Sequence, residues 1–131
     1  MTVFLYVDGG TRGNVICLVD PQKRKTIVKR RKGAATNNDL EYLAVIYGIE
    51  YARKYYPRDK IIIKSDSMLV IKQVKQLWKI KSATLAILNR KVLSKMTKSM
   101  AVSWVPREAN LAGIHLEDIK DSLSPSKDTL K

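Results

Sequence analysis

Short apolar runs separated by polar stretches predict a chain that alternates strands and helices. Residues 2–7 are mostly apolar and rich in β-branched and aromatic side chains, as expected for a strand buried on both faces. A glycine-containing turn follows, and residues 15–19 and 25–31 then predict two further strands separated by the Asp20-Pro21 pair. Consecutive strands joined by short turns favour a three-stranded antiparallel meander.

Helical spacing dominates the next part of the chain. Asn37, Asn38 and Asp39 can cap a helix that we expect to reach about Tyr55, because Pro57 prevents its continuation. The later predicted elements are a strand at 61–64, helices within 70–77 and 85–93 joined by residues 78–82, a strand at 100–105, and a short helix from about residue 110. A helix between the first and fourth strands predicts a right-handed crossover that makes these strands parallel neighbours. The order therefore predicts an α/β fold with a five-stranded mixed sheet.

The composition fits one globular domain. The chain has 131 residues, of which 45% are hydrophobic, and we expect residues 1–120 to form the domain and residues 121–131 a mobile tail. No apolar run approaches the roughly 20 residues of a membrane span, and the first residues lack the basic leader of a signal peptide. Cys17 is the only cysteine, which excludes an intrachain disulfide. These features predict a cytoplasmic protein without a membrane partner.

Positive charge is both high and segregated. The formal net charge is +13, seven basic residues and no acid lie within residues 22–32, and residues 67–107 contain no Asp or Glu. Such a distribution favours a polyanionic partner, above all nucleic acid. The alternative is a solvated surface that only aids solubility, but solubility alone does not explain the segregation of the two signs.

Three acidic residues interrupt this pattern at positions that look buried. Asp8 ends the first apolar run, Glu41 lies in the mostly apolar first helix, and Asp66 ends the fourth predicted strand. The carboxyl ends of adjacent parallel strands meet at one sheet edge, and a face of small residues allows the helix to bring Glu41 there. Converging buried carboxylates repel one another unless a cation pairs with them, and hard divalent cations prefer oxygen ligands. The alternatives for single residues are a surface charge and strand-end caps.

Several segments together resemble the ribonuclease H family. They are Asp-Gly-Gly at 8–10, Thr-Asn-Asn-Asp-Leu-Glu-Tyr-Leu-Ala at 36–44, Ser-Asp-Ser-Met-Leu-Val-Ile-Lys-Gln-Val at 65–74, and the segments 78–81 and 104–110. The resemblance implies a ribonuclease H-like fold and an endonuclease that cuts the RNA strand of RNA–DNA hybrids by two-metal-ion catalysis, leaving 5′-phosphate and 3′-hydroxyl ends. It also implies two Mg²⁺ or Mn²⁺ ions held by Asp8, Glu41 and Asp66, with Asp8 as the bridging ligand.

The last acidic residue of the family pattern is missing. Members usually carry a fourth acid, an Asp that follows Ala, where this chain has Gly113 or Ile114. Glu117, one helical turn further on, is our candidate replacement as a catalytic metal ligand, and Asp118 is a weaker one. His115 is a candidate proton shuttle in product release, although a lone histidine in contact with solvent is the more common situation.

The resemblance also indicates contacts with the nucleic acid. Glycines allow close backbone approach, and amide side chains can both donate to and accept from the 2′-hydroxyl that distinguishes RNA. The predicted nucleic-acid-binding residues are Gly9, Gly10, Thr36, Asn37, Asn38, Lys72, Trp78, Lys79, Lys81, Arg107 and Asn110. For residues 36–38 helix capping is an alternative or additional role, and for Trp78 the alternative is a core position between helices.

Two other functions remain open at this stage. One is a non-catalytic nucleic-acid-binding domain of the same fold, in which the loss of the fourth acid abolished efficient chemistry. The other is a nuclease of related fold that acts on DNA. We expect a monomer that binds an RNA–DNA hybrid, with duplex RNA as a further possible partner.

Overall fold

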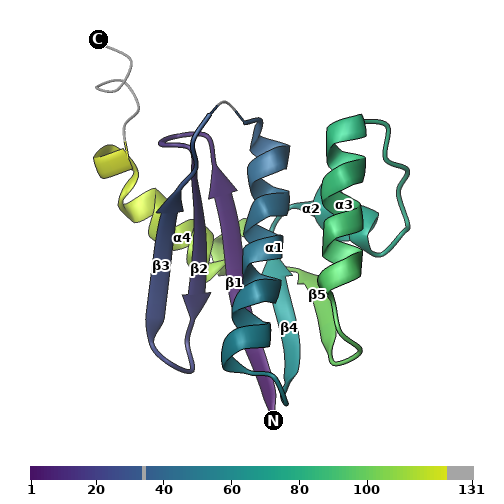
Figure 1. Cartoon of the computed structure of the whole chain (residues 1–131). Coiled ribbons are helices and arrows are strands. Elements are labelled where there is room, and N and C mark those ends of the chain that lie inside the picture. The colour runs from purple at the N-terminus through teal and green to yellow at the C-terminus, as the bar shows by residue number, and fades with distance from the viewer. Residues whose placement is uncertain (34, 124–131) are drawn as a thin grey trace.

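Five strands form one mixed sheet in the order β3-β2-β1-β4-β5. The computed structural model describes residues 1–33 and 35–123. The strands are β1 (Thr2–Gly10), β2 (Val15–Asp20), β3 (Lys25–Arg30), β4 (Lys60–Ser65) and β5 (Met100–Trp104), and the helices are α1 (Asn37–Tyr55), α2 (Met68–Val74), α3 (Ala83–Lys95) and α4 (Leu111–Asp118). Figure 1 shows α1 in front of the sheet, α3 beside it, and α4 behind the sheet.

The pairing of the strands confirms the predicted topology. β1, β2 and β3 form the antiparallel meander, and β1 pairs with β4 in parallel, with Leu5 opposite Ile63. β5 extends the parallel half, with Ile63 opposite Val102. The carboxyl ends of β1 and β4 therefore lie next to each other, where the sequence predicted the acidic residues to meet.

Helix α1 lies on the main hydrophobic core. Alternate residues of β1, Val3, Leu5 and Val7, are fully buried on the face that α1 covers. Gly48 allows the close approach of helix and sheet, because a Cβ atom at this position would lie 3.0 Å from the Val7 Cγ1 atom. Glu41 lies two turns before Gly48 on the same helix, so this packing also holds Glu41 against the sheet.

The opposite face of the sheet is covered by α4 at the meander. Val15 and Cys17 of β2 pack there against Ala112 and Leu116 of α4. Burial, followed by the nearby charge of Asp8, raises the pKa of the Cys17 thiol to about 12. Cys17 is therefore a buried apolar contact and not a reactive thiolate.

The first helix begins with a capping box formed by Thr36 and Asp39. The Thr36 hydroxyl accepts a hydrogen bond from the Asp39 N–H, and the Asp39 carboxylate accepts one from the Thr36 N–H, which completes a capping box. The predicted capping by Asn37 and Asn38 was wrong, because both residues are already helical, whereas Asp39 and the alternative capping role of Thr36 are confirmed. Strand β1 also continues to Gly10, two residues into the predicted turn.

The C-terminal boundary differs in part from the prediction. Residues 120–123 form a 3₁₀ helix, and Leu123 is buried against the α4 side of the sheet. Residues 121 to 123 of the predicted tail are thus folded, with Leu123 in apolar contact with the sheet. Residues 124–131 lie outside the described residues, so the rest of that prediction stays a prediction. Within the described part of the chain, no helix has the length and apolarity needed to cross a membrane.

Candidate metal centre

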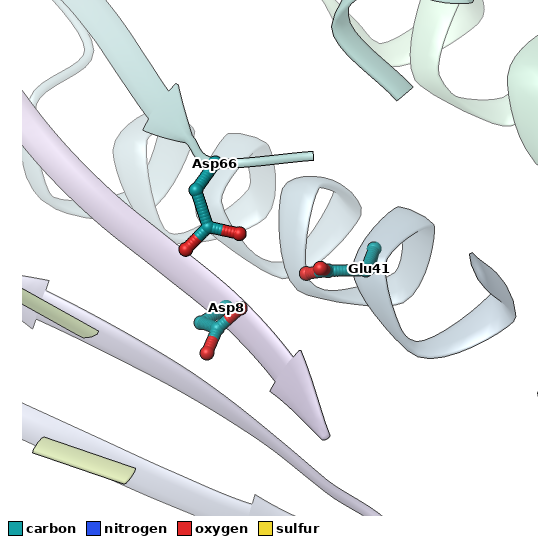
Figure 2. A group of neighbouring side chains, drawn as sticks. All are labelled: Asp8, Glu41 and Asp66. Carbon is teal, nitrogen blue, oxygen red and sulfur yellow. The ribbon is translucent and has the colours of Figure 1, made fainter. Parts of the chain in front are cut away.

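Three carboxylate groups converge at the carboxyl ends of β1 and β4. Asp8 comes from β1, Glu41 from the first turns of α1, and Asp66 from the residue after β4. One oxygen atom of each lies within 4.8 Å of the others. Figure 2 shows the three side chains directed toward a common space between strand ends and helix. The structure therefore brings together the acidic residues that the sequence singled out.

Backbone packing at Gly9 positions Glu41. The Gly9 N–H donates a hydrogen bond of 3.0 Å to the Glu41 Oε1 atom. A Cβ atom at position 9 would lie 2.5 Å from the Leu40 carbonyl group, a distance that backbone atoms do not tolerate. Position 9 therefore requires glycine because α1 crosses β1 there. Gly9 also lines the pocket beside the carboxylates, so its contact with nucleic acid stays a prediction.

Two other side chains fix Asp66. The Asn110 Nδ2 atom donates to the Asp66 Oδ2 atom and to the Val7 carbonyl oxygen, each at 3.0 Å. The Trp104 indole N–H donates to the Asp66 carbonyl oxygen at 3.2 Å. Asp66 is thus held from its backbone and from its side chain, a preorganised arrangement.

Burial and repulsion from neighbouring carboxylates raise the pKa values of Asp8 and Glu41. Burial, followed by the charge of Asp66, raises the pKa of Asp8 to about 6. Burial, followed by the charge of Asp8, raises the pKa of Glu41 to about 9. Both shifts oppose the negative charge that the cluster would carry at neutral pH, so a cation at this position would relieve a real electrostatic penalty.

The donor set fits a hard divalent cation. It consists of carboxylate oxygens, the ligands that Mg²⁺ and Mn²⁺ prefer. Among the described residues, the Asp8 Oδ1 atom is a buried side-chain oxygen without a hydrogen-bond partner. Such an orphaned acceptor is rare in folded proteins and marks the place where a cation would bind.

Of the two positions considered for the missing acid, Gly113 lies next to the cluster. A Cβ atom there would lie 3.3 Å from the Asp8 Oδ2 atom and 3.3 Å from the Asp66 Oδ2 atom. Ile114, the other position considered from the sequence, is exposed. Position 113 therefore faces the carboxylates of Asp8 and Asp66 and carries no side chain of its own.

Glu117 is near this cluster but not part of it. Its carboxylate forms an ion pair of 2.6 Å with Lys120, and its side chain is 64% exposed. The hydrogen bond from Lys120, followed by the charge of Lys120, lowers the pKa of Glu117. Glu117 lines the same pocket as Asp8 and Gly113, so its role as a replacement ligand stays a prediction. His115 is half-buried and does not line this pocket, while the weaker candidate Asp118 lines a neighbouring pocket.

The pocket beside the carboxylates is open and partly basic. Its lining includes the predicted residues Gly9, Gly10, Asn37 and Arg107, and also Arg12 and Lys120, which were not predicted from the sequence. Arg12 lies in the turn after β1 and Lys120 follows α4, and neither belongs to a sequence motif that marks a site residue. The pocket therefore places cationic side chains next to the acidic cluster.

Asn110 does not have the predicted role. It is 0% exposed, and besides its bonds to Asp66 and Val7 it accepts a hydrogen bond from the Ala112 N–H at the start of α4. A fully buried side chain cannot contact the nucleic acid, so this prediction was wrong. The sequence did contain a signal for the correct role, because Asn is a strongly preferred N-cap residue.

The other predicted contact residues lie on the surface. Thr36, Asn37 and Asn38 are exposed at the start of α1. Trp78 is 48% exposed and lines a shallow pocket between α2 and α3 with Leu77, so it is not the core residue of the alternative interpretation. Lys79, Lys81 and Arg107 are exposed and Lys72 is half-buried. Their contacts with nucleic acid stay predictions.

The chain is similar to families and proteins with related domains. Residues 4–116 match a ribonuclease H-like family described as "Reverse transcriptase-like". The "Bifunctional protein Rv2228c" of Mycobacterium tuberculosis and the "Uncharacterized protein Mb2253c" of Mycobacterium bovis are each 32% identical to it over 120 residues. These alignments cover 84% of this chain but 33% of the relatives, so the chain spans about a third of the length of these curated proteins.

Several solved structures are similar to this fold over almost the whole chain. The N-terminal RNase H domain of Rv2228c, solved as a fusion with maltose-binding protein, has a TM-score of 0.73 at 27% identity, covering 96% of this chain and 98% of that chain. RNase H1 from Halobacterium salinarum has a TM-score of 0.73 at 26% identity, with coverages of 93% and 98%. LC11-RNase H1, from compost, was solved in complex with an RNA/DNA hybrid; its TM-score is 0.74 at 25% identity, with coverages of 93% and 99%.

Proposed function

The chain belongs to the ribonuclease H family, and on this premise we propose that it is a divalent-metal-dependent endonuclease that hydrolyses the RNA strand of RNA–DNA hybrids. The convergence of Asp8, Glu41 and Asp66 within 4.8 Å carries this proposal. The three residues come from separate segments of the chain, and the fold brings them together. Both raised pKa values indicate that the fold tolerates the cluster against an electrostatic penalty.

The three carboxylates would hold Mg²⁺ or Mn²⁺. When bound, a pair of such ions supplies water activation on one side of the phosphodiester and charge stabilisation at the leaving oxygen. The products would carry 5′-phosphate and 3′-hydroxyl ends. The protein itself contributes rigid ligands: the Gly9 N–H orients Glu41, and Asn110 orients Asp66. Arg12 and Arg107, which line the adjacent pocket, would attract the phosphate backbone.

Hybrid specificity would come from the exposed start of α1. Asn37 and Asn38 carry amide groups that can pair with a 2′-hydroxyl, and Asn37 lines the pocket beside Asp8. The similar LC11-RNase H1, which binds an RNA/DNA hybrid in its solved structure, supports this choice of substrate. Cleavage of duplex RNA, a monomeric state and a cytoplasmic location stay predictions.

The decisive experiment compares substrates. Labelled RNA–DNA hybrid, duplex RNA and duplex DNA are incubated with the protein and Mg²⁺ or Mn²⁺, and the cleaved strand and its ends are identified. We expect cuts within the RNA strand of the hybrid, and none after chelation of the metal. Tight binding without cleavage would support a nucleic-acid-binding domain instead, an alternative that Gly113 in place of a fourth acid favours. Cleavage of DNA alone would support a DNA-directed nuclease.

A further inference from the structure

Lysine and tyrosine side chains pair along the flank of the molecule formed by β3 and α1. Three ammonium groups lie over aromatic rings: Lys29 over Tyr47 at 5.0 Å, Lys25 over Tyr55 at 5.9 Å and Lys23 over Tyr56 at 5.1 Å. We call these six residues the Lys–Tyr flank. The three lysines are exposed, so their ammonium groups remain accessible to a partner.

The spacing of strand and helix creates these pairs. Lys25, Ile27 and Lys29 alternate toward the α1 side of β3, and Ile27 packs on the main core. Four residues of a strand extend about 13 Å. Eight residues of a helix, from Tyr47 to Tyr55, extend about 12 Å. The spacing of the lysines along β3 therefore matches the spacing of the tyrosines along α1.

A buried carboxylate fixes the far end of the flank. The Asp20 Oδ2 atom accepts hydrogen bonds of 2.7 Å from the hydroxyls of Tyr51 and Tyr56, and its Oδ1 atom accepts from the N–H groups of Gln22 and Lys23. The turn that carries Lys23 is thus attached to the end of α1. Lysines held against rings on a fixed backbone lose less conformational freedom when they bind a ligand.

The charge of the flank is not neutralised within the described residues. The ion pairs between residues of the described ranges, Lys95–Glu50 and Lys120–Glu117, involve none of these lysines. The Asp20 carboxylate is completely buried and occupied by its hydrogen-bond donors. The flank therefore presents a row of cations without a counterion from these parts of the chain.

The flank begins close to the metal centre. Lys29 pairs with Ile16 of β2, and Ile16 pairs with Gly9 of β1, whose N–H binds Glu41. Two strand spacings separate Lys29 from Gly9, which is about 10 Å. A base pair advances about 3.4 Å along a duplex. A duplex placed at the carboxylates therefore reaches Lys29 within roughly three base pairs, and Lys25 lies further along β3.

We propose that the Lys–Tyr flank is a phosphate-binding surface that holds a nucleic-acid duplex beyond the segment cleaved at the metal centre. The proposal rests on the proposed function for the identity of the duplex, an RNA–DNA hybrid. The preordered row of ammonium groups matches a repeating phosphate chain better than a single anion. Phosphate contacts of this kind position a duplex without reading its sequence.

The test compares two double variants of equal charge. Lys25→Gln/Lys29→Gln removes two cations of the flank, and Lys60→Gln/Lys98→Gln removes two exposed lysines at the opposite end of the sheet. Binding to a hybrid of about 20 base pairs is measured without divalent metal over a series of salt concentrations. The flank variant should bind about tenfold more weakly at about 0.1 M salt, with a salt slope smaller by about 2. The control variant should bind like the wild type, and Lys25→Arg/Lys29→Arg should restore affinity.

The outcomes separate this proposal from the proposed function. Equal binding by the flank and control variants, or no binding of hybrid by the wild type, would overturn the flank as a phosphate-binding surface. Binding to vesicles that contain phosphatidylserine is measured in parallel. If the flank variant binds these vesicles more weakly than the control variant but binds the hybrid equally well, the flank is a membrane-binding surface and the proposal is overturned. Weaker hybrid binding by the flank variant supports the phosphate-binding surface even if the wild type does not cleave the hybrid. In that case only the proposed nuclease activity would be contradicted.

Discussion

The Asn110 Nδ2 atom lies 3.0 Å from the Asp66 Oδ2 atom, and this hydrogen bond joins the start of α4 to the metal centre. The same amide group donates to the Val7 carbonyl oxygen, one residue before Asp8. One buried side chain thus orients one carboxylate and holds the strand that carries another. The metal centre depends on Asn110 for its geometry, although Asn110 itself is not among the acidic ligands.

Replacement of Asn110 by Ala should affect both stability and metal binding. It removes a helix cap and leaves the Val7 carbonyl group without its donor, so the free energy of unfolding should fall by about 2–3 kcal/mol. Mn²⁺ affinity should also fall, because Asp66 loses its fixed orientation. Chemical denaturation and calorimetric titration with Mn²⁺ measure the two effects. A loss of hybrid affinity without either effect would return Asn110 to the predicted role in nucleic-acid contact.

Replacement of Asp8 by Asn should stabilise the protein in the absence of metal at alkaline pH. The substitution removes a buried charge and one source of repulsion for Glu41, and it should increase the free energy of unfolding at pH 8 by about 2 kcal/mol. Thermal denaturation in the presence of a chelator, with wild type and Asp8→Asn side by side, measures this effect. An Asp8→Asn protein that melts below the wild type at pH 8 would contradict the electrostatic penalty.

The same comparison predicts a definite dependence on pH. The pKa of Asp8 is raised from 3.8 to about 6 by burial and then by Asp66, and the pKa of Glu41 from 4.5 to about 9 by burial and then by Asp8. Raised carboxyl pKa values give stability that is present below about pH 4 and lost as pH rises through about 6 and about 9. The advantage of Asp8→Asn should therefore be small at pH 4 and grow between pH 5 and 9, and Mn²⁺ should stabilise the wild type most at the alkaline end.

The strand order and the acidic cluster were predictable because each depends on strong local signals. Asp8 and Asp66 end apolar runs whose parallel pairing follows from the helix between them, and Glu41 lies on a face of small residues. The resemblance of short motifs to the ribonuclease H family then predicted the metal-dependent nuclease reaction. These predictions depended on periodicity and chain order, which a sequence states directly.

The roles of Gly9 and Asn110 were not predictable in the same way. Gly9 looks like a turn residue, and only the position of Leu40 in the folded chain shows that a side chain cannot fit. Asn110 has bonds to residues 44 and 103 positions away in the sequence. The Lys–Tyr flank was visible only as a run of basic residues, since the tyrosines that order it belong to another element. Contacts between distant segments decide such roles.

Replacement of Asp66 by Asn should abolish cleavage and preserve the fold. The Asn side chain can still accept the hydrogen bond from Asn110 through its oxygen, but it no longer supplies an anionic ligand. Hydrolysis of the hybrid should fall by at least about a hundredfold, since ligand charge contributes several kcal/mol to such reactions. Gel-based cleavage and metal-free binding assays measure the two properties. Substantial residual turnover would contradict the ligand role of Asp66.

Replacement of Glu117 by Gln decides whether this residue replaces the missing acid. In the structure Glu117 pairs with Lys120, an exposed ion pair that contributes little to stability. If Glu117 is a metal ligand, its replacement by Gln should raise the Mg²⁺ concentration required for cleavage several-fold. The thermal stability of the protein should stay unchanged. Lys120→Gln serves as the control, because it breaks the same pair and keeps the carboxylate. An unchanged metal dependence in Glu117→Gln would exclude Glu117 as a ligand.

Replacement of Gly113 by Asp should introduce the missing fourth acid at the correct place. The new Cβ atom would lie 3.3 Å from oxygens of Asp8 and Asp66, a close contact that both side chains must relieve by small shifts. Without metal, the added carboxylate increases repulsion, so the protein should melt at a lower temperature than the wild type at pH 8. With Mn²⁺ the sign should reverse, because a fourth anionic ligand strengthens ion binding. Gly113→Asn has nearly the same shape without the charge, and it should show the steric loss but no gain in Mn²⁺ affinity. Equal Mn²⁺ affinities for the Asp and Asn variants, measured by calorimetry, would mean that position 113 does not face the ions.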